Sequence, residues 1–220
     1  MSDPDRTALT REKILAMLAA GRVSPEEADE LLSAAQGRPR PWRRWLNPFA
    51  WASAPQLWGL AGATAAASIA CAPFGIAFDG ALDMHLVSAP HPWRRAWIEA
   101  LVAWPWLASC LWLATRIPPR RGRWRDMLAM VGAARLPLLI AGVLTRLLIG
   151  EPPTADPDPG QHHLLLVAML VAVPLSVVFI AGLWQAFRTV GGGQRPYATL
   201  SFTAALIIAE TSSKLLLWVL

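Results

Sequence analysis

Five charged residues lie within long apolar stretches of this sequence and are its clearest candidates for chemistry. They are Glu99, Arg135, Arg146, Glu210 and Lys214. A charge in the hydrocarbon core of a bilayer is costly and is normally paired, so each of them indicates an ion pair or a polar site. Glu210 and Lys214 are four residues apart and share a helix face. By depth, we expect Glu99 to pair with Arg146 and Arg135 to reach Glu210. We interpret these residues as ion pairs that stabilise the protein; a polar site for a lipid headgroup, an ion or a proton is the alternative.

No other motif in the sequence indicates catalysis. The run 191–193 is Gly-Gly-Gly, but it lacks the Lys-Ser/Thr pair that completes a phosphate-binding loop. His162 and His163 are adjacent and cannot point the same way on a helix. His85 and His91 lie near two aspartates, and we expect all four side chains to be solvated or interfacial. No nucleophile and base occur at a spacing that supports catalysis, so we expect no enzymatic activity, no cofactor and no metal.

The elements that carry these residues are five apolar stretches of about the ~20 residues that a membrane-spanning helix needs. Hydrophobic residues make up 55% of the chain and charged residues only 16%, which is far below the charge of soluble domains. The sequence therefore predicts an all-α membrane protein, a five-helix transmembrane bundle preceded by an N-terminal cytoplasmic helical hairpin. The predicted spans cover residues 55–78, 97–115, 127–149, 164–187 and 198–220.

Arginine alternates between the connections of these stretches. It is abundant before the first span, in 116–126 and in 188–197; it is sparse between the first two spans and absent from 150–163. By the positive-inside rule, the N-terminus lies in the cytoplasm and the C-terminus outside. Because only two of the 20 basic residues are lysine, the composition suggests a GC-rich bacterial genome, and hence a multi-pass protein of the inner membrane.

Prolines and small residues predict how the spans pack. Each of the first four spans carries a proline that we expect to kink its helix. Gly62, Ala66 and Ala70 recur every four residues in the first span, and we expect this stripe to pack inside the bundle rather than to form a homodimer. The four prolines are Pro73, Pro105, Pro137 and Pro174.

Residues 1–36 predict a cytoplasmic hairpin of two helices, 9–20 and 25–35. Ser24 and Glu27 form a capping box at the start of the second helix, with Pro25 in its first turn. About 30 residues are too few to fold without outside help, so we expect the hairpin to self-associate, to pack against the membrane domain or to bind another protein, as yet unidentified. A solvated helical cap with no partner is the alternative. The predicted organisation is the hairpin, a juxtamembrane linker (37–54) and a transmembrane domain (55–220).

Basic and aromatic residues mark the predicted cytoplasmic interface of the membrane. Arginine beside tryptophan before a membrane helix is typical of headgroup-level anchoring on anionic lipid. The adjacent helix accounts for this composition, so we expect no nucleic-acid partner. The predicted lipid-interface residues are Arg38, Arg40, Trp42, Arg43, Arg44 and Trp45 in the linker, and Arg120, Arg121, Arg123 and Arg125 in the second basic segment.

Two parts of the chain resemble known families. The segment ILAMLAAGRVSPEEADELLSAA (14–35) resembles the SHOCT-like helical hairpins of bacterial membrane proteins, which implies an oligomerising head. Residues 50–220 resemble the YIP-type family of five-span proteins, on the arginine-rich segment 116–126, GAARLPLLI (132–140) and GLWQAFRTVGG (182–192). This resemblance implies a cytosolic N-terminus and a non-enzymatic organising, regulatory or recruiting role; the eukaryotic members bind Rab GTPases. A small transporter or channel subunit that uses Arg135, Glu210 and the proline kinks is the alternative.

Overall fold

The computed structural model describes residues 12–21, 23, 28, 31–32, 49, 52–88, 90–116, 122–150, 159–191 and 197–219, with the side chains of 159–162 left out. The chain divides into two compact units, Met1–Trp51 and Ala52–Leu220. In the first unit, residues 12–19 are helical, as are 28, 31 and 32, and Ile14 and Ala28 are buried. Most of the predicted second helix, 25–35, and almost all of the linker 37–54 lie outside the described residues.

The second unit is mostly helical. Its helices are α4 (Ala54–Ala70), α5 (Trp93–Ala114), α6 (Trp124–Ala134), α7 (Leu136–Ile149), α8 (Pro159–Gly191) and α9 (Ala198–Val219). Four helical stretches among the described residues are long and apolar enough to cross a membrane: α5, the continuous stretch of α6 and α7, most of α8, and α9. Helix α4 has 17 residues, or about 26 Å at ~1.5 Å per residue, slightly less than the ~30 Å of a hydrocarbon core.

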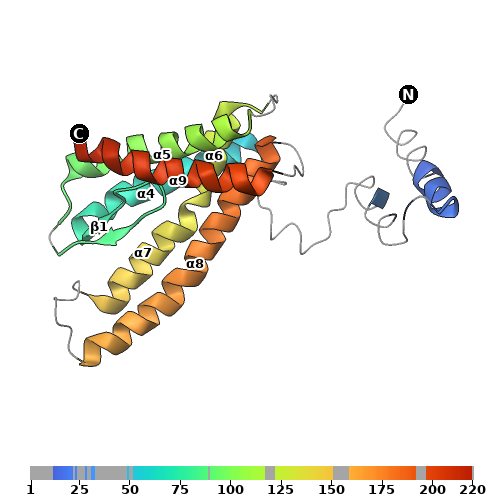
Figure 1. Cartoon of the computed structure of the whole chain (residues 1–220). Helices are drawn as coiled ribbons and strands as arrows, with labels where there is room; N and C mark the ends of the chain where they lie inside the picture. The colour runs from blue at the N-terminus through green and yellow to red at the C-terminus, as the bar shows by residue number, and fades with distance from the viewer. Residues whose placement is uncertain are drawn as a thin grey trace. The chain divides into compact units, whose positions relative to one another are not determined.

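Helix α6 lies at the centre of this unit. It packs against α4, α5 and α8, whereas α9 packs on α5 and α7 packs on α8. Figure 1 shows α5 and α9 side by side, and α7 and α8 side by side at an angle to them. Most of α6 is buried, in contrast to α8, whose apolar side chains are largely exposed. Such exposure is typical of a helix that faces lipid.

The first predicted span ends earlier than expected. Helix α4 stops at Ala70 and is followed by the 3₁₀ turn η2 (Ala72–Phe74) and a two-stranded hairpin. Its strands β1 (Ile76–Ala77) and β2 (His85–Leu86) are antiparallel. Pro73 therefore lies in the turn after the helix, and the prediction that it kinks a membrane helix is wrong. Gly75 follows with φ of 71°, a conformation that glycine adopts without steric cost and that turns the chain into the hairpin.

The other three prolines lie in or next to membrane helices. Pro105 and Pro174 lie inside α5 and α8, as expected. In the third predicted span, the helix is interrupted at Arg135, which ends α6 and precedes α7. Pro137 is then in the first turn of α7, where a missing N–H costs least. The expected kink is thus a break between two helices, and it falls at the charged residue.

The predicted small-residue stripe on α4 faces away from the other helices, not toward them. Gly62, Ala66 and Ala70 are exposed on the outer surface of α4, so the expectation that they pack internally is wrong. Three helices instead approach one another closely at Gly132 of α6. A Cβ there would lie 2.5 Å from the Trp104 ring and 2.7 Å from the Ala61 Cβ, so three helices meet where only glycine fits.

Candidate functional site around the hairpin loop

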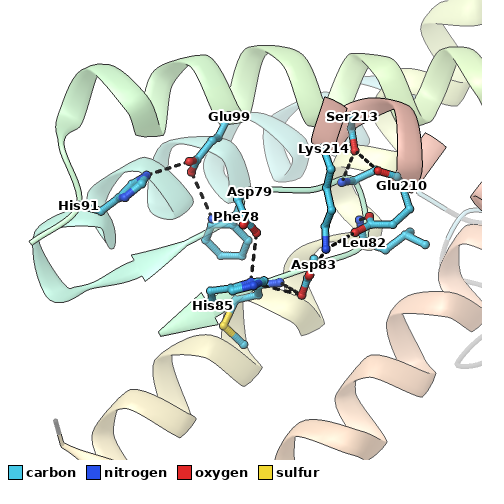
Figure 2. A network of polar contacts seen from close by, with 12 residues as sticks. Phe78, Asp79, Leu82, Asp83, His85, His91, Glu99, Glu210, Ser213 and Lys214 are labelled. Atoms are coloured by element: carbon cyan, nitrogen blue, oxygen red, sulfur yellow. Dashed lines mark hydrogen bonds and ion pairs between the residues drawn. The ribbon is translucent and has the colours of Figure 1, made fainter. Parts of the chain in front are cut away.

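The hairpin loop, residues 78–84 between β1 and β2, is inserted among the helices. Ile76 and Ala77 of β1 are buried, as are Phe78 and Ala81 of the loop. Buried irregular backbone needs hydrogen-bond partners from the surrounding protein, because it has no regular ladder to supply them. Those partners come from side chains of α5, α9 and the α6–α7 break. Figure 2 shows the side chains from α5 and α9 around the loop.

Helix α9 holds one side of the hairpin loop through Glu210 and Ser213. The Ala81 N–H donates to Ser213 Oγ (3.0 Å) and the Leu82 N–H to Glu210 Oε2 (2.7 Å). Two successive backbone donors thus meet two acceptors that are three residues apart on one helix face. The carboxylate is packed so closely that a Cβ on Gly80 would lie 2.7 Å from Glu210 Oε1. An alanine in place of Gly80 would displace the Glu210 carboxylate.

Lys214 connects α9 to the same loop. Its Nζ lies 3.1 Å from Glu210 Oε1, which confirms the predicted pair four residues apart. The same Nζ lies 2.6 Å from Asp83 Oδ2. Burial raises the pKa of Asp83, but the hydrogen bond from Lys214, the nearby His85 and the Met84 N–H together outweigh it, so the pKa is lower than usual. Asp83 is therefore held as a carboxylate at neutral pH.

Arg135 contacts the hairpin loop from the α6–α7 break. Its Nη1 donates to the Ala81 carbonyl oxygen (3.3 Å), and its guanidinium carbon lies 5.7 Å from the centre of the Phe78 ring. The guanidinium is also close enough to Glu210 to interact with it electrostatically. No ion pair within 4.0 Å joins Arg135 and Glu210 among the described residues, so the predicted pair is not formed; both residues bind the hairpin loop instead.

Glu99 of α5 is the most buried charged side chain among the described residues, at 2% exposed. It accepts hydrogen bonds from the Phe78 N–H (3.3 Å) and Arg95 Nε (3.3 Å), and its Oε1 lies 2.9 Å from His91 Nε2. Arg95 also donates to the carbonyl oxygen of Leu217, near the end of α9 (3.1 Å). Glu99 therefore fixes the start of the loop, and Arg95 extends this contact to α9.

The predicted Glu99–Arg146 pair is not formed in the described part of the chain. Arg146 Nη1 donates instead to the carbonyl oxygen of Gly150, at the end of its own helix. This is a common arrangement, since a cation near a helix C-terminus meets carbonyls that have no helical partner. The depth estimate failed because Glu99 finds its partners, His91 and Arg95, close to it in the sequence.

Few of the predicted lipid-interface residues can be placed. Arg123 and Arg125 are exposed, next to and within the first turn of α6, as that prediction requires. The others lie outside the described residues: Arg38, Arg40, Trp42, Arg43, Arg44, Trp45, Arg120 and Arg121.

Sequence reasoning missed several side chains that hold the loop. Asp83 and Ser213 were not among the predicted site residues, and neither were His91 and Arg95. Two of them could have been found from helical spacing, because Arg95 is four residues before Glu99 and Ser213 is three residues after Glu210. The role of Asp83 depends on the fold of the hairpin.

Comparison with known proteins gives no relative for this arrangement, since no family model, curated protein or solved structure matches the chain.

Proposed function

We propose that this chain is an integral inner-membrane protein of YIP-like type that organises or recruits other molecules and catalyses no reaction. The observation that carries this proposal is the use of the charged residues: Glu99, Arg135, Glu210 and Lys214 all bind the hairpin loop. Their hydrogen-bonding capacity is directed at the protein's own backbone and side chains. Such residues serve as structural partners rather than as a catalytic set.

Five crossings, with the N-terminus in the cytoplasm and the C-terminus outside, agree with the contacts between the ends of the helices. The hairpin that follows α4 touches α9 near the end of that helix, at Ser213 and Lys214. At the other end, a Cβ on Gly122, before α6, would lie 2.4 Å from Val190, near the end of α8. Helix α4 is then a short first crossing, completed by the turn and hairpin that follow it.

The SHOCT-like head is proposed to assemble the protein. Its predicted apolar faces are too small to fold unaided, and self-association would bury them. Deleting residues 1–36 should convert the oligomer to a smaller species, measured as mass by light scattering in detergent. Gly62→Leu is the matched control, because the exposed stripe on α4 offers a second surface for self-association. An unchanged mass after the deletion, with a reduced mass for Gly62→Leu, would assign assembly to α4 instead.

Recruitment is proposed to occur on the arginine-rich cytoplasmic side, with anionic lipid and a protein as the partners. Arg123 and Arg125 are exposed there. Each basic residue near an anionic surface contributes about 1 kcal/mol of attraction. Vesicle flotation of the 1–54 segment, with and without anionic lipid, tests the lipid part; capture from native membranes with the same segment as bait tests the protein part.

One observation favours a second function, proton or ion transport. A cavity of about 20 Å³ lies against Glu99 and Arg135, with Thr64 and Ser68 on α4 also lining it. This volume suits about one water molecule, so the cavity could relay a proton but is too small for an organic substrate. Glu210→Gln separates the two functions, because Glu210 interacts with Arg135 of the cavity. Under transport the variant changes proton flux into vesicles and leaves assembly intact, whereas under the organising role the flux of the parent equals that of empty vesicles.

A further inference from the structure

Asp79, Asp83 and His85 bring three metal-ligating atoms together beside the hairpin loop. One oxygen from each carboxylate and a ring nitrogen of the histidine all lie within 4.8 Å of one another. Asp79 and Asp83 belong to the loop and His85 to β2, where it pairs with Ala77 of β1. All three side chains are partly exposed, so an ion could reach them from solution. Figure 2 shows both carboxylates directed at the imidazole.

The spacing of these atoms fits a common ion. His85 Nδ1 is 3.1 Å from Asp79 Oδ1 and 3.5 Å from Asp83 Oδ1. Ligands at the ~2.0–2.2 Å typical of zinc are separated by about 2.9 Å in octahedral and about 3.4 Å in tetrahedral coordination. The two observed separations bracket the tetrahedral value, and the two carboxylate ligand atoms lie within 4.8 Å of each other.

A second, independent observation is an oxygen without a donor. Asp79 Oδ1 is shielded from solvent and has no hydrogen-bond partner, although His85 Nδ1 is only 3.1 Å away. The two atoms face each other without the geometry of a hydrogen bond. A shielded carboxylate oxygen with no donor is costly, and a bound cation would remove that cost.

The net charge of the surrounding side chains is negative and favours a bound dication. Asp79, Asp83 and Glu210 are three carboxylates close to one ammonium, Lys214. With His85 neutral, these groups sum to about −2, or about −1 when Arg135, which interacts with Glu210, is counted. Lys214 occupies Oδ2 of Asp83 and leaves Oδ1 directed at His85. The Met84 N–H donates to that Oδ1 (2.8 Å), which orients the ligand as outer hydrogen bonds do in metal sites.

We propose that Asp79, Asp83 and His85 bind a divalent transition-metal ion of the zinc class. An imidazole with two carboxylates suits such an ion better than calcium, which takes six to eight oxygens. Three protein ligands leave at least one coordination position for water or for an external ligand. Because all three ligands lie on one hairpin, the ion would fix the fold of the hairpin and would present an open metal position beside α9.

The test measures Zn²⁺ binding by the full-length protein in detergent, by isothermal titration and by metal analysis after dialysis. The expected result is one Zn²⁺ per chain with micromolar or tighter affinity. His85→Asn and Asp79→Asn should each weaken binding at least about tenfold. These two side chains make no hydrogen bond to a helix among the contacts that the structure describes, so the variants should fold. Asp83 is left unchanged because its pair with Lys214 also holds the loop.

Two controls make the result decisive. His163→Ala removes an exposed histidine at the start of α8 and should leave Zn²⁺ affinity unchanged. Ca²⁺ at the same concentration should not displace the bound Zn²⁺. The proposal is overturned if the parent binds no stoichiometric Zn²⁺, if His85→Asn and Asp79→Asn bind it as tightly as the parent does, or if His163→Ala causes the same loss as they do.

Discussion

Removing the carboxylate of Glu99 should destabilise the protein mainly by depriving one buried backbone donor of its acceptor. In Glu99→Leu, the Phe78 N–H loses its partner in a buried position, which costs about 1–3 kcal/mol. The ion pair with Arg95 adds at most about 1 kcal/mol, because Arg95 is 45% exposed and can return to water or headgroups. The interaction with His91, which is largely buried, adds about 1 kcal/mol more.

The expected sum is about 3 kcal/mol for Glu99→Leu. For a chain of this size, 1 kcal/mol corresponds to about 2–4 °C, so the melting temperature in detergent should fall by about 6–12 °C. Glu99→Gln keeps an amide oxygen for the Phe78 N–H and should lose less than half as much. Asp126→Asn is the matched control, since that carboxylate is exposed in the first turn of α6 and should matter by less than about 1 kcal/mol.

Two results would refute this reasoning. If Glu99→Leu melted within 1 °C of the parent, the hydrogen bond to the loop would contribute nothing to the stability of the protein. If Glu99→Gln were as unstable as Glu99→Leu, the charge rather than the backbone acceptor would be what matters. Thermal unfolding followed by intrinsic tryptophan fluorescence gives all four melting temperatures under the same conditions.

The remaining predictions concern packing and the other partners of the loop. Gly132→Ala should destabilise the protein by about 1–3 kcal/mol, because three helices meet there. Gly62→Ala, with open space around it, should be neutral or slightly stabilising. Equal melting temperatures for these two variants would contradict the predicted packing. Arg135→Leu should cost about 1–3 kcal/mol in thermal melts by leaving the Ala81 carbonyl without its side-chain donor, and an unchanged melting temperature would contradict this role. Lys214→Met should cost no more than about 1 kcal/mol in the same assay, because Lys214 is 46% exposed; a loss above 3 kcal/mol would show that its two ion pairs are stronger than their exposure implies.

The helical membrane class followed from the sequence because apolar length and low charge are sufficient signals for it. The expected helices match α5, α8 and α9 closely, since Trp93–Ala114, Pro159–Gly191 and Ala198–Val219 each contain most of a predicted stretch. The prediction that the first apolar stretch is helical as far as residue 78 was wrong, because hydropathy does not distinguish a helix from a buried hairpin. Ile76, Ala77 and Phe78 are as apolar as the residues of α4 but belong to the hairpin.

The charged residues could be predicted as buried partners, but most of their partners could not. Glu210 and Lys214 were paired correctly because both lie on one helix, where spacing alone decides the contact. The partner of Arg135 is a backbone carbonyl, that of Ala81. No pattern in the sequence marks such an acceptor, because it becomes available only when the hairpin loop enters the bundle. Predictions based on side-chain charge therefore found the charged side chains and missed the loop that they bind.

Hydrogen exchange of the hairpin loop in lipid tests most directly the claim that these buried charges hold the loop inside the bundle. Peptides that cover residues 76–86 can be followed by mass spectrometry in the parent and in Glu99→Leu. Our account predicts that the amides of Phe78, Ala81 and Leu82 exchange in the parent as slowly as those of the adjacent helices, and at least tenfold faster in the variant. Complete exchange of this segment within seconds in the parent would contradict it.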